Sequence, residues 1–189
     1  MQKTSPSAPL RVLTAHNVFD PSFNFDFLIE KAAHELTLSL AEGPNFFYWH
    51  AMNFSVSIHA IADHLWWVKA IDDPQWNKHQ PNFVNWVTNE NDCIAAFLDI
   101  SNTYKHSERS RPAQRNKVTE HLKIYHNDVI IKNSDPPDEP ELRNCIIDKR
   151  QTGFSWLYWP VITTKTGRLI YYRYAAESAL DWWRKYERQ

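Results

Sequence analysis

Two segments of the sequence carry side chains whose types and spacing could support proton transfer. Asp63 and His64 are adjacent and follow a stretch, 43–62, that contains no Lys, Arg, Asp or Glu. A second segment, 93–106, ends in a group of amide, amine and imidazole side chains. A histidine beside a carboxylate can act as general acid or base near neutral pH, and a lysine can hold a phosphate oxygen. The candidate catalytic residues are Asp63, His64, Asn102, Lys105 and His106.

A structural role for these side chains is the alternative, and it is the one that we favour. Polar groups that are buried on facing helices hydrogen-bond to one another and thereby fix how the helices align. His50, Asn53, Ser57 and His64 share one side of the expected second helix. A cluster of this composition can hold a helical bundle together without performing any chemistry.

The spacing of the histidines does not favour a metal site. His50 and His59 are nine residues apart, half a turn out of phase on a helix, so they cannot bind one ion from that helix. The sequence contains 3 glycines, and none belongs to a glycine-rich motif that would bring the backbone close to a phosphate. We therefore expect neither a metal nor a cofactor.

The two halves of the chain differ in charge. Residues 1–100 carry 5 basic and 11 acidic side chains, whereas residues 101–189 carry 16 and 11. This difference could attract the halves to each other, drive association between copies, or form a basic face for an anionic partner such as RNA. The basic segment 105–117 contains the candidate nucleic-acid-binding residues. These are Arg109, Arg111, Arg115 and Lys117.

Hydrophobic periodicity predicts a bundle of three helices in residues 23–107. The first begins at Asn24 or Asp26 and ends before Gly43, the second covers about 45–71, and the third covers about 82–106. The second helix has the clearest apolar stripe, formed by Phe47, Ala51, Phe54, Ile58, Ile61, Leu65 and Val68. Because a short connection joins the second and third helices, we expect them to form an antiparallel hairpin.

A period of two follows the helices and predicts strands in residues 108–189. One hairpin is expected about Asn127, and a second, from 154 to 172, about Gly167. Pro160 lacks a backbone N–H, which predicts an edge position for its strand. A final helix is expected from about Ala175. Helices followed by strands and a last helix are typical of the α+β class.

The domain organisation follows from these elements. Residues 1–22 are rich in Pro, Ser and Thr and are expected to form a mobile N-terminal arm. Residues 23–107 form the helical bundle, and residues 108–189 add antiparallel hairpins and the C-terminal helix. We expect these two parts to pack as one domain.

Aromatic doublets suggest a surface for association. Large aromatic side chains at helical spacing belong to the core or to an interface more often than to a base-stacking surface. The last helix carries more aromatic area than one of its sides can bury, which favours a homodimer. The candidate interface residues are Trp66, Trp67, Trp182 and Trp183.

Cysteine content and hydropathy bear on the compartment. Cys93 and Cys145 cannot form a disulfide framework, and residues 1–19 lack the apolar run of a secretion signal. Polar side chains interrupt the uncharged stretch 43–62, so we interpret it as a buried helix and not as a membrane span. These features predict a cytoplasmic protein without a membrane partner.

The sequences Ala62-Asp63-His64-Leu65 and Asn102-Thr103-Tyr104-Lys105-His106 resemble the A-L-D-H-L and N-x-D-K-H patterns of uncharacterised bacterial helical proteins. Those proteins are similar to the HEPN superfamily (higher eukaryotes and prokaryotes nucleotide-binding). The resemblance implies a helical bundle over about residues 25–107, dimerisation and, in active members, metal-independent ribonuclease activity. The arginine and histidine motif of active members is matched in spacing by Arg11 with His16 and by Arg115 with His121, outside the expected bundle helices.

Three functions are therefore expected, in order of preference. The first is an interaction protein that forms homodimers and uses its polar cluster structurally. The second is an HEPN-like ribonuclease in which His64 or His106 acts as acid or base and Lys105 or Arg109 contacts phosphate. The third is a nucleic-acid-binding protein that uses residues 105–117.

Overall fold

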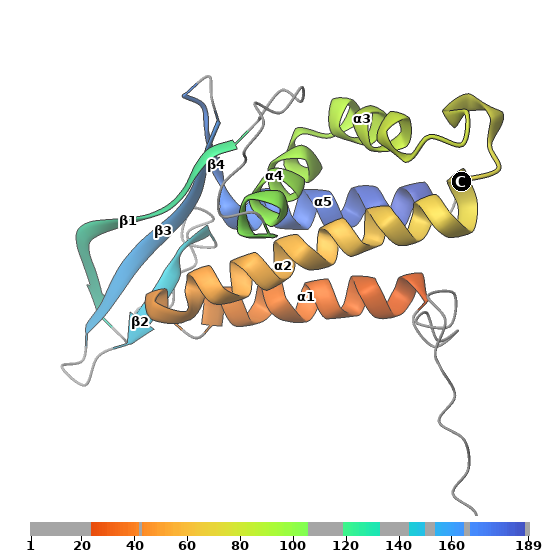
Figure 1. The fold of residues 1–189 in the computed structure, drawn as a ribbon. Helices are drawn as coiled ribbons and strands as arrows, with labels where there is room; N and C mark the ends of the chain where they lie inside the picture. Colours follow the sequence, from red (N-terminus) through yellow and green to blue (C-terminus); the bar gives the residue numbers. More distant parts are fainter. Residues whose placement is uncertain are drawn as a thin grey trace, which may run out of the picture.

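The computed structural model describes residues 24–41, 43–105, 119–132, 144–149, 154–164 and 167–187, and it confirms the α+β class (Figure 1). Helices make up most of the fold, and a small antiparallel sheet lies at one end of them. In chain order the elements are the helices α1 (Phe25–Ala41) and α2 (Pro44–Leu65), the π-helical turn η2 (Trp66–Ala70), the 3₁₀ turn η3 (Pro74–Trp76), the helices α3 (Gln80–Glu90) and α4 (Asp92–Lys105), the strands β1 (Thr119–Lys132), β2 (Ile146–Lys149), β3 (Phe154–Thr164) and β4 (Leu169–Tyr171), and the helix α5 (Tyr172–Glu187).

The helices α1 and α2 form an antiparallel pair. Asn24 caps α1 as expected, because its side-chain Oδ1 accepts a hydrogen bond from the backbone N–H of Phe27 at 2.9 Å. Gly43 separates the two helices with a φ of 82°, a left-handed conformation that suits glycine, and Pro44 follows as the first residue of α2. The predicted boundary between the first two helices is therefore confirmed.

The apolar stripe of α2 is buried from Phe47 through Leu65, as the periodicity predicts. Val68 was expected on the same stripe and is instead 62% exposed. The backbone N–H of Ile71 donates to the carbonyl of Trp66 at 2.8 Å, which is an i to i+5 hydrogen bond. A π-helical turn holds more residues than an α-helical turn, so the side chains after Leu65 are rotated away from the stripe.

The prediction of a single third helix is wrong, because the structure has two helices, α3 and α4, in its place. Asn91 interrupts them with an extended backbone, φ −145° and ψ 104°. Its N–H donates to Val87 O at 3.1 Å at the end of α3, and its side-chain Oδ1 accepts from Ile94 N at 2.9 Å at the start of α4. Asn91 thus ends one helix and caps the next.

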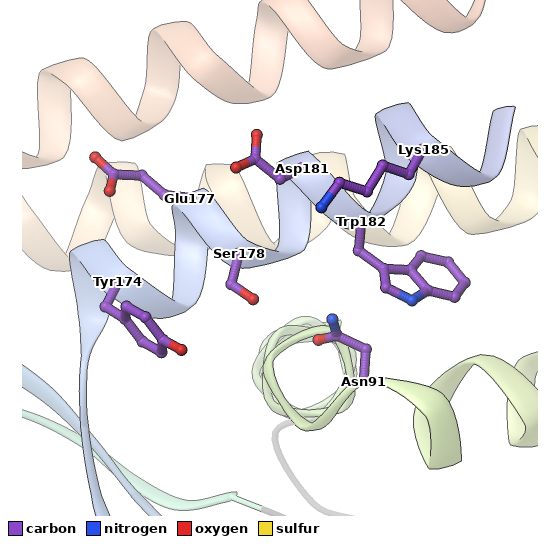
Figure 2. Close-up of a pocket in the computed structure, with 7 residues that line it drawn as sticks. All are labelled: Asn91, Tyr174, Glu177, Ser178, Asp181, Trp182 and Lys185. Atoms are coloured by element: carbon purple, nitrogen blue, oxygen red, sulfur yellow. The ribbon is translucent and has the colours of Figure 1, made fainter. Parts of the chain in front are cut away.

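The break at Asn91 gives α4 a new direction. In Figure 2, α4 is seen end-on where α5 runs across the view. The rings of Phe54 and Phe97 mark where α4 meets α2, with centroids 4.7 Å apart. The expected antiparallel hairpin of the second and third helices is therefore replaced by a crossing.

The expected hairpin about Asn127 is also wrong, because β1 continues through that residue and pairs with β3 along its length. The register runs from Leu122 opposite Ile162 to Lys132 opposite Phe154, with an irregularity between Asn127 and Ile130. Asn127 is followed by Asp128 and not by the glycine that favours a two-residue turn. The turn-like residues thus produce a local irregularity of the strand.

The second hairpin is confirmed, since β3 and β4 are joined by a turn that contains Gly167 at φ 80°. The edge position predicted from Pro160 is wrong, because β3 is the central strand. Pro160 lies opposite Ile124 of β1, and on its other side it falls between the segments that pair with β2 and β4. Its missing N–H therefore costs the sheet no hydrogen bond on that side.

The helix α5 packs along α2 and contacts it at its start and the π-helical turn η2 at its end. At its start, the Tyr172 ring contacts Phe47, with centroids 4.9 Å apart. At its end, Lys69 Nζ donates to the carbonyls of Tyr186 and Glu187 at 3.2 and 3.1 Å. The same ammonium lies 5.2 Å from the centre of the Tyr186 ring. Lys69 thus caps the C-terminal end of α5.

We expect Lys69→Met to lower the free energy of unfolding by about 0.5–1 kcal/mol, the usual worth of a cation at a helix C-terminus. Thermal unfolding followed by circular dichroism measures the change. Lys185→Met is the matched control, since Lys185 lies in the same last turn and has no hydrogen bond or ion pair to any described residue. Equal effects of the two substitutions would show that the contact between Lys69 and the α5 carbonyls adds nothing.

Candidate functional site

The predicted catalytic residues of α2 are not joined to those of α4. Asp63 Oδ1 accepts a hydrogen bond from Gln80 Nε2 of α3 at 2.8 Å. None of the hydrogen bonds among the described residues links Asp63 or His64 to Asn102. A polar contact between α2 and α4 is instead made by His59 Nδ1 and Ser101 Oγ, 3.2 Å apart.

The surroundings of His64 favour its neutral form. The side chain is half-buried, and this burial lowers the pKa of the imidazole from its ordinary value. The neighbouring Asp63 carboxylate is held by an amide of another helix. Asp63 and His64 are adjacent in the sequence but differ in surroundings, because Asp63 is hydrogen-bonded to Gln80 whereas burial lowers the pKa of His64.

Several predicted residues lie outside the described part of the chain. These are His106 of the catalytic set, the basic residues Arg109, Arg111, Arg115 and Lys117, and the N-terminal arm 1–22. Lys105 is the last residue of α4. The ribonuclease and nucleic-acid-binding functions that depend on this segment stay predictions.

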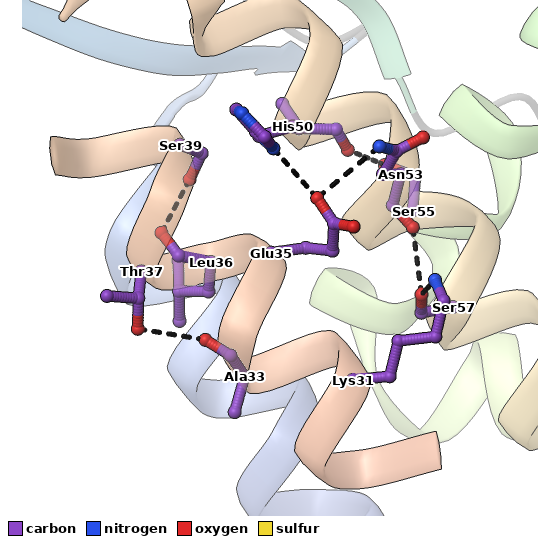
Figure 3. Close-up of polar contacts among 11 residues, drawn as sticks. Lys31, Ala33, Glu35, Leu36, Thr37, Ser39, His50, Asn53, Ser55 and Ser57 are labelled. Carbon is purple, nitrogen blue, oxygen red and sulfur yellow. Dashed lines mark hydrogen bonds and ion pairs between the residues drawn. The ribbon is translucent and has the colours of Figure 1, made fainter. Parts of the chain in front are cut away.

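The structure assembles a different polar network between α1 and α2, shown in Figure 3. Glu35 Oε2 of α1 accepts a hydrogen bond from His50 Nδ1 of α2 at 2.8 Å and a longer one from Asn53 Nδ2 at 3.4 Å. One turn earlier on α1, Lys31 Nζ donates to Ser57 Oγ at 2.7 Å. Glu35, the later residue on α1, contacts His50 near the start of α2, and Lys31, the earlier one, contacts Ser57 further along α2. This order of contacts is that of an antiparallel pair.

Helical spacing explains why these residues meet. Lys31 and Glu35 are four residues apart on α1, and His50, Asn53 and Ser57 are three and four residues apart on α2. The sequence already predicts that His50, Asn53 and Ser57 lie on one side of α2. Glu35 was missed as its partner, because the facing of two helices is a long-range property.

The hydrogen bond between Glu35 and His50 is largely shielded from solvent. The side chains of Glu35 and His50 are 14% and 13% exposed, respectively.

Tyr172 of α5 is fully buried near Glu35. Burial raises the pKa of the Tyr172 hydroxyl, the Glu35 charge raises it further, and a hydrogen bond with Ser39 opposes the rise. The phenol is therefore neutral at neutral pH.

The hydroxyl groups beside this network have no arrangement for nucleophilic catalysis. Ser55 Oγ donates to the Ala51 carbonyl at 2.7 Å, and Ser57 Oγ donates to the Asn53 carbonyl at 2.9 Å. A serine nucleophile would need its proton directed to a base such as the His50 imidazole. The network therefore fits a structural role, in which buried polar groups satisfy one another.

The four predicted interface tryptophans differ in exposure. Trp66 and Trp183 are buried within the chain, so their rings contribute to its own core. Trp182 is half-buried and stacks on Tyr186, with centroids 5.4 Å apart. Trp67 is 59% exposed. A partner can therefore contact Trp67 without unfolding the chain.

A shallow groove of about 370 Å³ lies where α5 passes the junction of α3 and α4 (Figure 2). Its carboxylates are paired on the same helix, Glu177 with Arg173 at 2.9 Å and Asp181 with Arg184 at 3.2 Å. The groove is lined by Asn91, Tyr174, Glu177, Ser178, Asp181, Trp182 and Lys185.

The thiol next to this groove is not activated. Burial raises the pKa of the Cys93 thiol, and a hydrogen bond from Ser178 only partly opposes this rise. Because the thiolate is the reactive form, Cys93 is a poor nucleophile at neutral pH.

Within the described ranges, no three His, Cys, Asp or Glu side chains converge as ligands of one metal ion would. In the same ranges no helix combines the length and the apolar character needed to cross a membrane.

Comparison of the chain with family models, with curated proteins and with solved structures gives no match. The HEPN-like resemblance and the activity that it implies therefore stay predictions.

Proposed function

We propose that the protein acts through protein–protein contact and that it self-associates through one side of α2. This side, called here the outer face of α2, lies opposite the buried stripe that contains Ile58. Its members along α2 and the π-helical turn are Trp49, Met52, Val56, Ala60 and Trp67.

The observation that carries this proposal is the apolar character of the outer face. A surface helix ordinarily presents polar or charged side chains to solvent. Here Trp49 is 72% exposed, Met52 and Val56 are half-buried, and Ala60, which packs partly against the core, marks the edge of the face. No charged residue occurs from Gly43 to Ala62. Exposed apolar stripes of this kind usually contact another molecule.

The other sides of α2 contact α1, α4 and α5. Phe54 packs against Phe97 of α4 and Tyr172 of α5. His50 binds Glu35 of α1. The polar groups of α2 on these sides thus serve the fold, and the outer face is the part of α2 that they leave to solvent.

Mass in solution tests the proposal. Light scattering over about 1–100 μM, a range that detects weak dimers, should give a mass that rises towards about 45 kDa, twice the 22.4 kDa of the chain. Trp49→Glu should keep the protein monomeric, because it places a charge in the apolar face. Tyr174→Glu, at an exposed aromatic residue of α5, should leave the dimer intact. A monomer of the parent chain at every concentration would refute self-association.

A further inference from the structure

We infer that two copies of the chain pair with their α2 helices antiparallel about a two-fold axis at the level of Ile58, so that Trp49 of one copy contacts Trp67 of the other. The inference rests on the self-association proposed above and adds its geometry. The outer face of α2 supplies the contact surface, and a second copy is its occupant.

Positions on the outer face are symmetric about residue 58. Trp49 and Trp67 lie nine residues before and after it, and Val56 and Ala60 lie two residues before and after it. At 100° per residue Trp49, Val56 and Ala60 fall within about 20° of one line along α2, and the π-helical turn places Trp67 a few tens of degrees from that line. An antiparallel second copy therefore places each tryptophan opposite a tryptophan and each small side chain opposite a small one.

The sizes of these side chains suit close packing. Val56 and Ala60 at the centre let two helices approach to the usual 8–10 Å between axes. Trp49 and Trp67, with 72% and 59% of their surfaces exposed, then close the two ends of the contact. Such an interface is isologous, because each copy offers the same patch.

Charge selects the antiparallel orientation over the parallel one. Asp63 is the carboxylate nearest this face, and a parallel pair would bring the two Asp63 side chains together beside the apolar seam. In the antiparallel pair the two Asp63 residues are about 15 Å apart along the axis. The helix dipoles are also opposed in the antiparallel pair, which is the favourable arrangement.

The area available indicates a weak dimer. Residues 44–70 form a helical rod about 40 Å long and about 10–12 Å wide, which offers roughly 400–500 Å² per copy. A standard interface buries about 800 Å² per partner, and smaller ones belong to transient complexes. Phe46, Tyr48 and Val68 are exposed near the two ends of the rod and can add to the contact.

Disulfide trapping between two single variants tests the orientation. Trp49→Cys and Trp67→Cys proteins are prepared separately, mixed and oxidised gently. The mixture should form a disulfide dimer with one chain of each kind, and the opposite end of that dimer keeps its Trp49 to Trp67 contact. Each variant alone should cross-link far less, because its two cysteines would be about 27 Å apart along the axis.

The native cysteines do not disturb this experiment, and a control can remove them. Cys93 and Cys145 are buried, and Cys93→Ala with Cys145→Ala in both proteins should leave the result unchanged. Cross-linking of each variant with itself, without a disulfide dimer that contains one chain of each kind in the mixture, would show a parallel pair and overturn the inference while self-association stands. A parent protein that is monomeric by light scattering would instead overturn both proposals.

Discussion

Trp183→Ala should lower the free energy of unfolding by about 3–5 kcal/mol, the range for removing a large buried aromatic side chain. Trp183 is fully buried, and its ring contacts those of Trp182 and Tyr186, with centroids 4.9 and 6.1 Å away. A loss of this size is comparable with the whole stability of a marginal domain. Urea denaturation followed by circular dichroism measures it.

Two further variants separate packing from other causes. Trp67→Ala removes the same side chain from an exposed position and should change stability by much less. Trp183→Phe should cost less than Trp183→Ala, because it keeps a ring and removes an indole N–H that has no hydrogen-bond partner in the described structure. Equal midpoints for Trp183→Ala and the parent would contradict the buried position of this residue.

The second large effect is expected at the polar network between α1 and α2. Glu35→Ala should cost about 2–4 kcal/mol, because it leaves two largely buried side chains, those of His50 and Asn53, without their hydrogen-bond acceptor. The substitution removes the carboxylate that accepts hydrogen bonds from His50 and Asn53. It also leaves a cavity between the two helices.

The control for this prediction lies on the same helix. Glu30 is exposed, so Glu30→Ala should change the unfolding midpoint very little. Glu35→Gln keeps the shape and one acceptor oxygen, and its loss should fall between those of the two alanine variants. If Glu35→Ala were as stable as Glu30→Ala, the hydrogen bonds of Glu35 would not stabilise the fold.

Local patterns were sufficient for the helices whose apolar side is continuous. The stripe of α2 was predicted through Leu65, and the boundary at Gly43 and Pro44 was correct, because periodicity and capping act within a few residues. The helix break at Asn91 was missed. An asparagine in a helical pattern can lie on its surface or cap a new helix, and only the packing of α4 across α2 decides between these.

Long-range pairing explains the errors in the strands and in the site. Asn127 looked like a turn residue, but pairing with β3 on both sides of it keeps β1 extended. Asp63 and Asn102 were grouped because their side chains could serve one proton-transfer site on facing helices, whereas the crossing of α4 joins His59 to Ser101. Glu35 and His50, which do meet, lie on helices whose relative facing no local pattern reveals.

The position of Tyr172 has a consequence for the synthesis of the chain. Its ring contacts Phe47, Phe54 and Phe97, so α5 completes a core that α2 and α4 begin 75 to 125 residues earlier. Until α5 has emerged from the ribosome, the apolar side chains of α2 and α4 that contact Tyr172 stay uncovered. The N-terminal helices are therefore exposed to chaperones during translation, and native packing waits for the last helix.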